Sequence, residues 1–111
     1  MIIIEYDPDK GEAIQDGKAD FIANNIANGD FPRSPGWKFD QERYPGLPLA
    51  RYATENIFDA IRVLVKKGRI KPDAIQFKFK DQIITIDKDG RCPNWPEGFC
   101  DYSTHWLMQL F

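Results

Sequence analysis

The segment from residue 30 to residue 50 most constrains what this 111-residue chain can fold into. Its four prolines are Pro32, Pro35, Pro45 and Pro48. Each proline lacks an amide hydrogen and restricts the residue before it, so neither a helix nor a long strand can cross the segment. Its aromatic residues are Phe31, Trp37, Phe39 and Tyr44. So many aromatic residues argue against simple disorder, and a long ordered loop is usually functional.

The residues before this segment predict one strand and one helix. The β-branched run from Ile2 to Ile4 is typical of a strand that is buried on both faces. After a turn at Asp7-Pro8, a helix is expected from about residue 12 to residue 28, and Gly29 is a natural stop. The apolar side expected for this helix consists of Ile14, Phe21, Ile22 and Ile26.

The residues after this segment predict a second helix, which Thr54 begins as the capping residue and Gly68 ends. The apolar residues that recur at helical spacing are Ile57, Phe58, Ile61, Leu64 and Val65. This spacing places them on one buried face.

A β-hairpin is predicted next, because Ile75, Phe77 and Phe79 alternate with polar residues. A turn at Asp81-Gln82 would place Phe79 opposite Ile84 and Phe77 opposite Ile86, with the apolar side chains on one face. The run "DKDG", residues 87–90, reads as a closing turn. A last amphipathic helix is expected from about residue 101, with Phe99, Trp106, Leu107 and Leu110 as its apolar residues.

These patterns predict a single small α+β domain over residues 1–111, with an N-terminal strand, two to three helices, a β-hairpin and an apolar C-terminal tail or helix. Three parts are expected within it: the first strand and helix at 1–29, the proline and aromatic loop at 30–50, and the remaining elements at 54–111.

Charge and composition exclude several classes of protein. Fifteen basic and seventeen acidic residues give a net charge of −2, so no global field favours nucleic acid. The densest basic run is Lys66, Lys67, Arg69 and Lys71. It suits the C-terminal end of a helix, and a phosphate contact is the alternative. No apolar run reaches membrane-spanning length and the N-terminus does not resemble a signal peptide, so a cytoplasmic protein without a membrane contact is expected.

Three residues near the C-terminus raise the question of a metal site. Cys92, Cys100 and His105 supply three possible ligands, which Asp89 or Asp101 could complete. Structural zinc prefers four ligands with close cysteine pairs, so the spacing favours two buried thiols and no zinc. No cofactor is expected either, because "GEAIQDGKA" departs from a phosphate-binding loop in its spacing and in Ala19.

Two acids follow the first strand. Glu5 and Asp7 lie where the carboxyl end of a buried strand is expected. Acids at such a position often hold magnesium in nucleotide enzymes, so a metal-dependent enzyme that uses this pair is one hypothesis.

Two motifs occupy the C-terminal half of the chain. The residues that fit a K-x-G-x-I-x-P-x-x-V/I pattern are Lys67, Gly68, Ile70, Pro72 and Ile75. The residues that fit D-x-D/N-G-x-x-x-x-W-P-x-G-F-F-D/E are Asp87, Gly90, Trp95, Pro96, Gly98, Phe99 and Asp101. In sequence, this half resembles the C-terminal region of OLD-like and RecF-like ABC-type ATPases of bacterial defence loci.

A further similarity covers the N-terminus, which resembles the Walker B strand of that family. It implies that Glu5 occupies the Walker B acidic position. The switch Thr-His-Ser is replaced by Ala53-Thr54-Glu55, and the P-loop half is absent from these residues. In place of the strand expected before the switch, the sequence has the proline and aromatic loop. In the family the tail packs on the ATPase head as a cap.

The sequence and the resemblance together favour a non-enzymatic interaction protein: an ATPase-head-like subunit or mimic that docks on a larger ATPase, on another defence component or on itself, in phage defence or counter-defence. An immunity or inhibitor protein that blocks a toxin or nuclease is the alternative from a different class. The partner-binding residues are expected to be Phe31, Arg33, Trp37, Phe39, Arg43 and Tyr44, with Arg51 as a further candidate. The structural anchors of the tail are expected to be Trp95, Pro96, Gly98 and Phe99.

Overall fold

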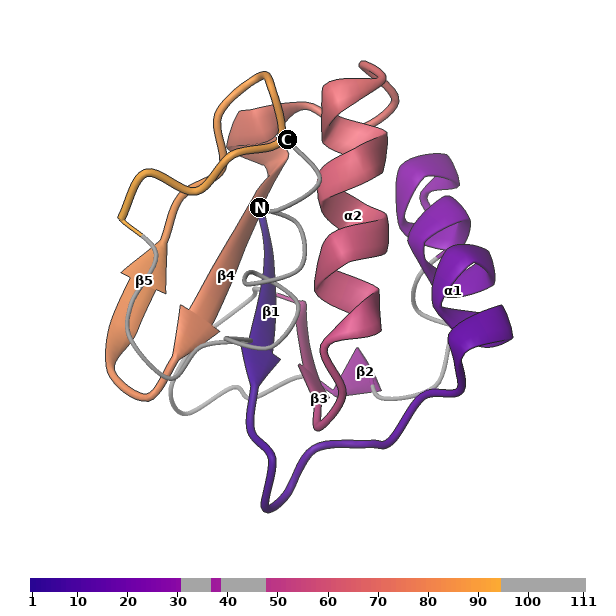
Figure 1. The fold of residues 1–111 in the computed structure, drawn as a ribbon, viewed down its shortest axis with the longest axis vertical. Coiled ribbons are helices and arrows are strands. Elements are labelled where there is room, and N and C mark those ends of the chain that lie inside the picture. The colour runs from indigo at the N-terminus through magenta and orange to yellow at the C-terminus, as the bar shows by residue number, and fades with distance from the viewer. Residues whose placement is uncertain (31–36, 39–47, 95–111) are drawn as a thin grey trace, which may run out of the picture.

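A mixed five-stranded sheet with two helices packed on it forms the described part of the chain, residues 1–30, 37–38 and 48–94 of a computed structural model (Figure 1). The elements are β1 (Ile2–Tyr6), α1 (Asp16–Asn28), β2 (Trp37–Lys38), β3 (Leu49–Tyr52), α2 (Asn56–Lys66), the 3-10 turn η2 (Pro72–Ala74), β4 (Ile75–Phe79) and β5 (Gln82–Ile84). The prediction of a small single α+β domain is confirmed.

The sheet is ordered β2-β3-β1-β4-β5, so β1 is its central strand. β1 runs parallel to β3 on one side and to β4 on the other, whereas β2 and β5 are antiparallel outer strands. Ile3 and Ile4 point to opposite faces of β1 and both are buried. The prediction of a strand buried on both faces is therefore confirmed.

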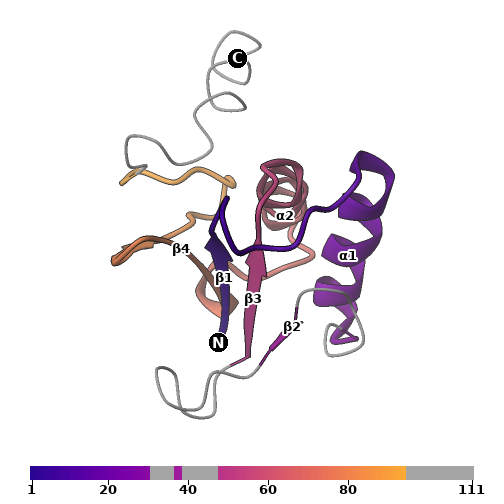
Figure 2. The ribbon, with the colours of Figure 1, turned by 90° about the horizontal axis from the view of Figure 1, so that it is seen from below.

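Both helices pack on the same face of the sheet (Figure 2). The core between the two layers includes Ile4 of β1, Ala50 and Tyr52 of β3 and Phe77 of β4. Successive strand residues face opposite sides, so Glu5, Arg51 and Lys78 must belong to the other face.

The helix α1 begins at Asp16, four residues later than expected, and ends at Gly29 as predicted. Gly29 has a φ of 80°, a conformation that suits glycine, and its amide donates to the carbonyl of Ile26. Phe21 is 63% exposed, so its predicted place on the apolar side is wrong. The other predicted residues, Ile14, Ile22 and Ile26, are buried as expected, and the buried side of α1 also includes Ala19 and Ala23.

The helix α2 buries all five side chains that were predicted for its apolar face. The predicted cap is wrong, because Glu55 and not Thr54 is the N-cap residue of α2. The Thr54 hydroxyl instead accepts a hydrogen bond from the amide of Ile14, at 3.3 Å. Gly68, with a φ of 76°, follows the end of α2 as expected.

The strand β3 lies where the sequence suggested only irregular structure. It begins directly after Pro48, whose carbonyl accepts the amide of Ile3 at 3.1 Å. A proline at this position is compatible with the sheet because it precedes the strand. The segment after α1 therefore returns to the centre of the sheet and supplies the parallel neighbour of β1.

The predicted β-hairpin is present, but its register differs by two residues. Phe77 lies opposite Ile84 and Phe79 lies opposite Gln82, joined by a turn at Lys80 and Asp81. Lys80 adopts a φ of 55°, which permits this tight two-residue connection. A shift of two residues keeps each side chain on its face, so the predicted apolar face is confirmed.

Several predicted residues lie outside the described part of the chain. They are Phe31, Arg33, Phe39, Arg43, Tyr44, Trp95, Pro96, Gly98, Phe99, Cys100, Asp101, His105, Trp106, Leu107 and Leu110. Trp37 belongs to the short strand β2, where its backbone pairs with Ala50.

A tight loop after β1 depends on Gly11. The amide of Gly11 donates to the carbonyl of Asp7 at 2.8 Å, and Glu12 then pairs with the end of β3. A Cβ atom at Gly11 would lie 2.3 Å from the carbonyl carbon of Tyr52 and 2.5 Å from the amide nitrogen of Ala53. These are backbone atoms on both sides of the contact, so the loop cannot relax by moving a side chain.

Gly11→Ala should therefore lower the free energy of unfolding by about 1–3 kcal/mol, measured by urea denaturation. Gly17→Ala is the matched control, because nothing lies within 4 Å of the added atom and Gly17 is in α1. The control should be neutral or stabilising by roughly 0.5–1 kcal/mol. Equal stability of the two variants would contradict the close packing of this loop.

Candidate functional site

Three charged residues form one row across the three parallel strands. Glu5 of β1 lies opposite Arg51 of β3 and opposite Lys78 of β4. The row lies on the face of the sheet away from α1 and α2, near the carboxyl ends of the strands. The edge formed by these strand ends is a common position for ligand sites in sheets with parallel strands.

Both carboxylate oxygens of Glu5 are held by cations. The ammonium of Lys78 donates to Oε2 at 2.9 Å, and Nε of Arg51 donates to Oε1 at 2.5 Å. The side chains of Lys78 and Glu5 are only 3% and 7% exposed, whereas Arg51 is 28% exposed. A charge this deeply buried is tolerated only when it is paired, so the three residues act as one ionic unit.

The ionic partners determine the protonation of Glu5. Burial by itself would raise the pKa of the Glu5 carboxyl, but hydrogen bonds from Lys78 and Arg51, together with their charges, outweigh it. The pKa therefore lies below its ordinary value of 4.5. A carboxylate stabilised in this way is a weak proton acceptor, which makes Glu5 a poor general base.

Asp7 does not form an open metal site with Glu5. Its Oδ2 lies 3.8 Å from Nε of Arg51, and its Oδ1 accepts the amides of Asp9 and Lys10 at 3.0 Å each. No group of three histidine, cysteine or carboxylate side chains that could hold a metal ion occurs within the described ranges. A divalent cation at Glu5 would also have to displace two protein cations, so the geometry does not favour the magnesium hypothesis.

Arg51, a further candidate for partner binding, belongs to the ionic row. Arg51 is anchored by Glu5 and only partly exposed, because its strand lies next to β1. The sequence did not identify Lys78 as a residue of this site. Lys78 alternates with Phe77 and Phe79, and a lysine in such a pattern normally faces water. The one sequence feature that could have indicated it is Glu5, because an acid in a buried apolar strand needs a cationic partner.

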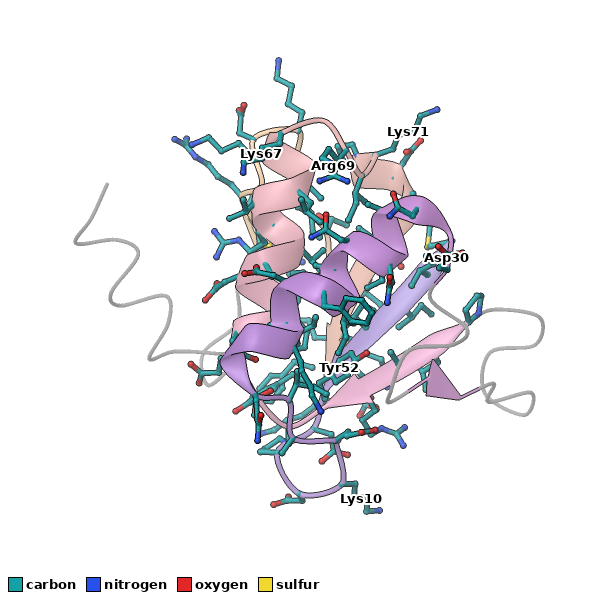
Figure 3. The ribbon with its side chains drawn as sticks, turned by 90° about the vertical axis from the view of Figure 1, so that its right-hand side faces the viewer. Lys10, Asp30, Tyr52, Lys67, Arg69 and Lys71 are labelled. Atoms are coloured by element: carbon teal, nitrogen blue, oxygen red, sulfur yellow. The ribbon has the colours of Figure 1, made fainter. Side chains whose placement is uncertain are left out.

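The basic run lies at one end of the molecule (Figure 3). Lys67, Arg69 and Lys71 are exposed there, and Lys10 lies at the opposite end, in the loop after β1. A groove of about 300 Å³ between α1 and α2 is lined by Lys67 and Arg69, by the acid Asp20 and by the half-exposed Val63. This groove combines apolar side chains with charges of both signs.

Cys92 is buried beside the charged side of α2. Burial, reinforced by the carboxylates of Asp87 and Asp59, raises the pKa of the Cys92 thiol from 9.0 to about 11, and the positive charge of Arg62 offsets only part of this rise. A neutral buried thiol is a poor nucleophile and a poor metal ligand. The prediction that Cys92 is a buried thiol is confirmed.

Comparisons of this chain with protein-family models, with curated proteins and with solved structures found no match. Among the helices described, none is long and apolar enough to cross a membrane.

Breaking the row of charges should strongly destabilise the fold. Glu5→Gln leaves the buried Lys78 ammonium without its carboxylate and should cost about 3–5 kcal/mol in urea denaturation. The double variant Glu5→Leu/Lys78→Met should recover much of this loss, because two apolar side chains of similar volume replace the ions. Asp73→Asn, a change at an exposed acid, should alter stability by less than about 0.5 kcal/mol.

The pH dependence follows from the lowered pKa of Glu5. Because the folded-state pKa lies below that of the unfolded chain, the ion pairs stabilise the fold fully above about pH 4.5, and this contribution is lost as the pH falls through the folded pKa. The acid side of the stability profile should therefore be shallower in Glu5→Leu/Lys78→Met than in the natural chain. Parallel profiles in the two proteins would contradict this assignment.

Cys92 should react slowly in the folded protein. A pKa of about 11 in place of 9.0 lowers the thiolate fraction at pH 8 by about a hundredfold. Alkylation by iodoacetamide, mapped by mass spectrometry, should therefore be at least that much slower at Cys92 in the folded chain than in urea. Equal rates in both states would show that the thiol is accessible.

Proposed function

We propose that this protein is a non-catalytic interaction subunit or mimic related to the head of an ABC-type ATPase, acting in phage defence or counter-defence. The observation that carries the proposal is the state of Glu5. Its two oxygens are occupied by Lys78 and Arg51, so the acid that the resemblance places at the Walker B position stabilises the fold. An acid used this way is unsuited to activating water or holding magnesium.

The order of elements supports the ATPase-like part of the proposal. The resemblance implies a strand directly before the switch position, and β3 ends at Tyr52, next to Ala53-Thr54-Glu55. α2 then follows and leads into the K-x-G-x-I-x-P segment. The sequence alone suggested a loop in place of this strand, so the presence of β3 supports the proposal.

The distribution of charge supports an interaction role. Residues 5–20 contain six acids and two lysines, whereas residues 62–71 contain five basic residues and no acid. A chain with separate acidic and basic regions can be steered and oriented by a partner whose charges are complementary to them. The groove between α1 and α2 lies at the basic end and offers Val63 as an apolar contact.

An immunity or inhibitor protein is the second candidate. The acidic loop after β1, with Asp7, Asp9 and Glu12, would suit a basic toxin or nuclease. The two candidates differ in which end of the molecule binds. If charge reversal in the acidic loop abolishes binding to a basic partner, that result would favour the inhibitor.

The first experiment tests whether the chain is a nucleotide enzyme. Isothermal titration of the full chain with Mg²⁺ and ATP should detect no binding in the micromolar range, and no phosphate should be released. Magnesium-dependent turnover that is lost in Glu5→Gln, while a circular dichroism spectrum shows the variant folded, would overturn the proposal.

The second experiment tests the partner class. The full chain is co-expressed with ABC-type ATPases of its native genome, and complexes are measured by size-exclusion chromatography. Trp37→Ala and Tyr44→Ala should weaken such a complex by about 2 kcal/mol or more, with melting temperatures that barely move. Lys67→Glu/Arg69→Glu should weaken it when the basic end contributes, whereas Lys18→Glu on α1 is the matched control.

A further inference from the structure

The side chain of Asn94 caps the outer edge of strand β5 by hydrogen-bonding to its backbone. The Nδ2 group of Asn94 donates to the carbonyl of Ile83 at 2.9 Å, and its Oδ1 accepts the amide of Thr85 at 3.3 Å. The side chain of Gln82 adds a third contact by donating to the carbonyl of Asn94 at 3.4 Å. Ile84, between the two bonded residues, pairs with Phe77 of β4.

These contacts imitate those of a neighbouring strand. In an antiparallel pair, successive residues alternately direct their amide and carbonyl groups to one neighbour and to the other. Ile84 faces β4, so Ile83 and Thr85 face outward, where another strand would bind. The primary amide of Asn94 carries N–H donors and a carbonyl acceptor, the same kinds of group as a peptide unit. The Asn94 side chain therefore makes the two hydrogen bonds that a peptide unit of a neighbouring strand would make.

The composition of β5 shows why such closure matters. Residues 82–86, Gln-Ile-Ile-Thr-Ile, contain no charge, no proline and no glycine, and four of the five are β-branched. Ile83 is a large apolar residue that remains 37% exposed. Segments of this kind pair readily with other chains, and natural proteins usually protect them with a charge or a proline on the strand. Here the charges stand only at the flanks, Asp81 and Asp87.

We propose that the outer edge of β5 is a strand-pairing surface for a second copy of this chain, and that Asn94 holds it shut. An uncharged strand meets no repulsion when it pairs antiparallel with itself, and a two-fold axis would place Ile83 of each copy near the other. Release of the Asn94 amide frees both bonded groups at once. This inference goes beyond the proposed function, since it concerns self-association and not the ATPase partner.

The test compares the full natural chain with Asn94→Ala in sedimentation equilibrium. The natural chain should remain monomeric over the whole concentration range, whereas Asn94→Ala should approach twice the monomer mass within that range. Asn28→Ala, a change at an exposed asparagine that ends α1, is the matched control and should behave like the natural chain.

A second substitution locates the contact. Ile83→Pro removes the outward amide of β5, and proline is tolerated where an edge amide faces solvent. Asn94→Ala/Ile83→Pro should therefore remain monomeric with the melting temperature of Asn94→Ala. Dimers that persist in this double variant, or an Asn94→Ala chain that stays monomeric at millimolar concentration, would overturn the proposal.

Hydrogen exchange of the Thr85 amide tests the proposal even where Asn94→Ala lowers the stability of the fold. The Thr85 amide should be protected in the natural chain, exposed in dilute Asn94→Ala and protected again when that variant is concentrated. Fast exchange of Thr85 at every concentration would contradict strand pairing, even where the rest of the sheet stays protected.

Discussion

The buried carboxylate of Glu5 is the constraint on which the sheet depends. An ionised side chain at this depth must be paired, and its partners come from positions 51 and 78, far away along the chain. Their pairing requires that β3 and β4 lie on either side of β1 in one register. A slip of one residue in either strand would move a cation to the opposite face and leave Glu5 buried without it. The ionic row thus specifies the strand alignment as well as contributing to stability.

The two faces of the sheet differ in polarity. The face covered by α1 and α2 is apolar, with Tyr6, Phe58 and Phe77 in edge-to-face contact near its centre. The other face carries the ionic row. The acidic loop lies at one end of the molecule and the basic run at the other, so the charges that hold the sheet together are separate from the charges at the two ends. Chemistry at Glu5 would have to break the interactions that keep the sheet aligned.

Sequence patterns predicted best where one interaction dominates. The face of α2 was predicted completely because five large apolar residues recur at a single spacing. Phe21 was misplaced because α1 buries alanines, whose small size carries little signal in an apolar pattern. Thr54 is a residue type that often caps helices, but its hydroxyl accepts a hydrogen bond from the amide of Ile14, which is 40 residues away in the chain. The predicted hairpin register was wrong by two residues, because Lys80 in the turn has a positive φ that a lysine rarely adopts.

The sequence by itself determined the local elements: a β-branched strand, an amphipathic helix ended by glycine, and an alternating hairpin whose apolar residues share a face. These follow from periodicity and backbone preference, which act between near neighbours. Only the tertiary structure decided that Arg51 and Lys78 flank Glu5, and that Asn94 closes the edge of β5. Those contacts join residues separated by 46, 73 and 11 positions. Their existence depends on which strands become neighbours, because a charge or an amide finds its partner by position in space, and spacing along the chain does not reveal that position.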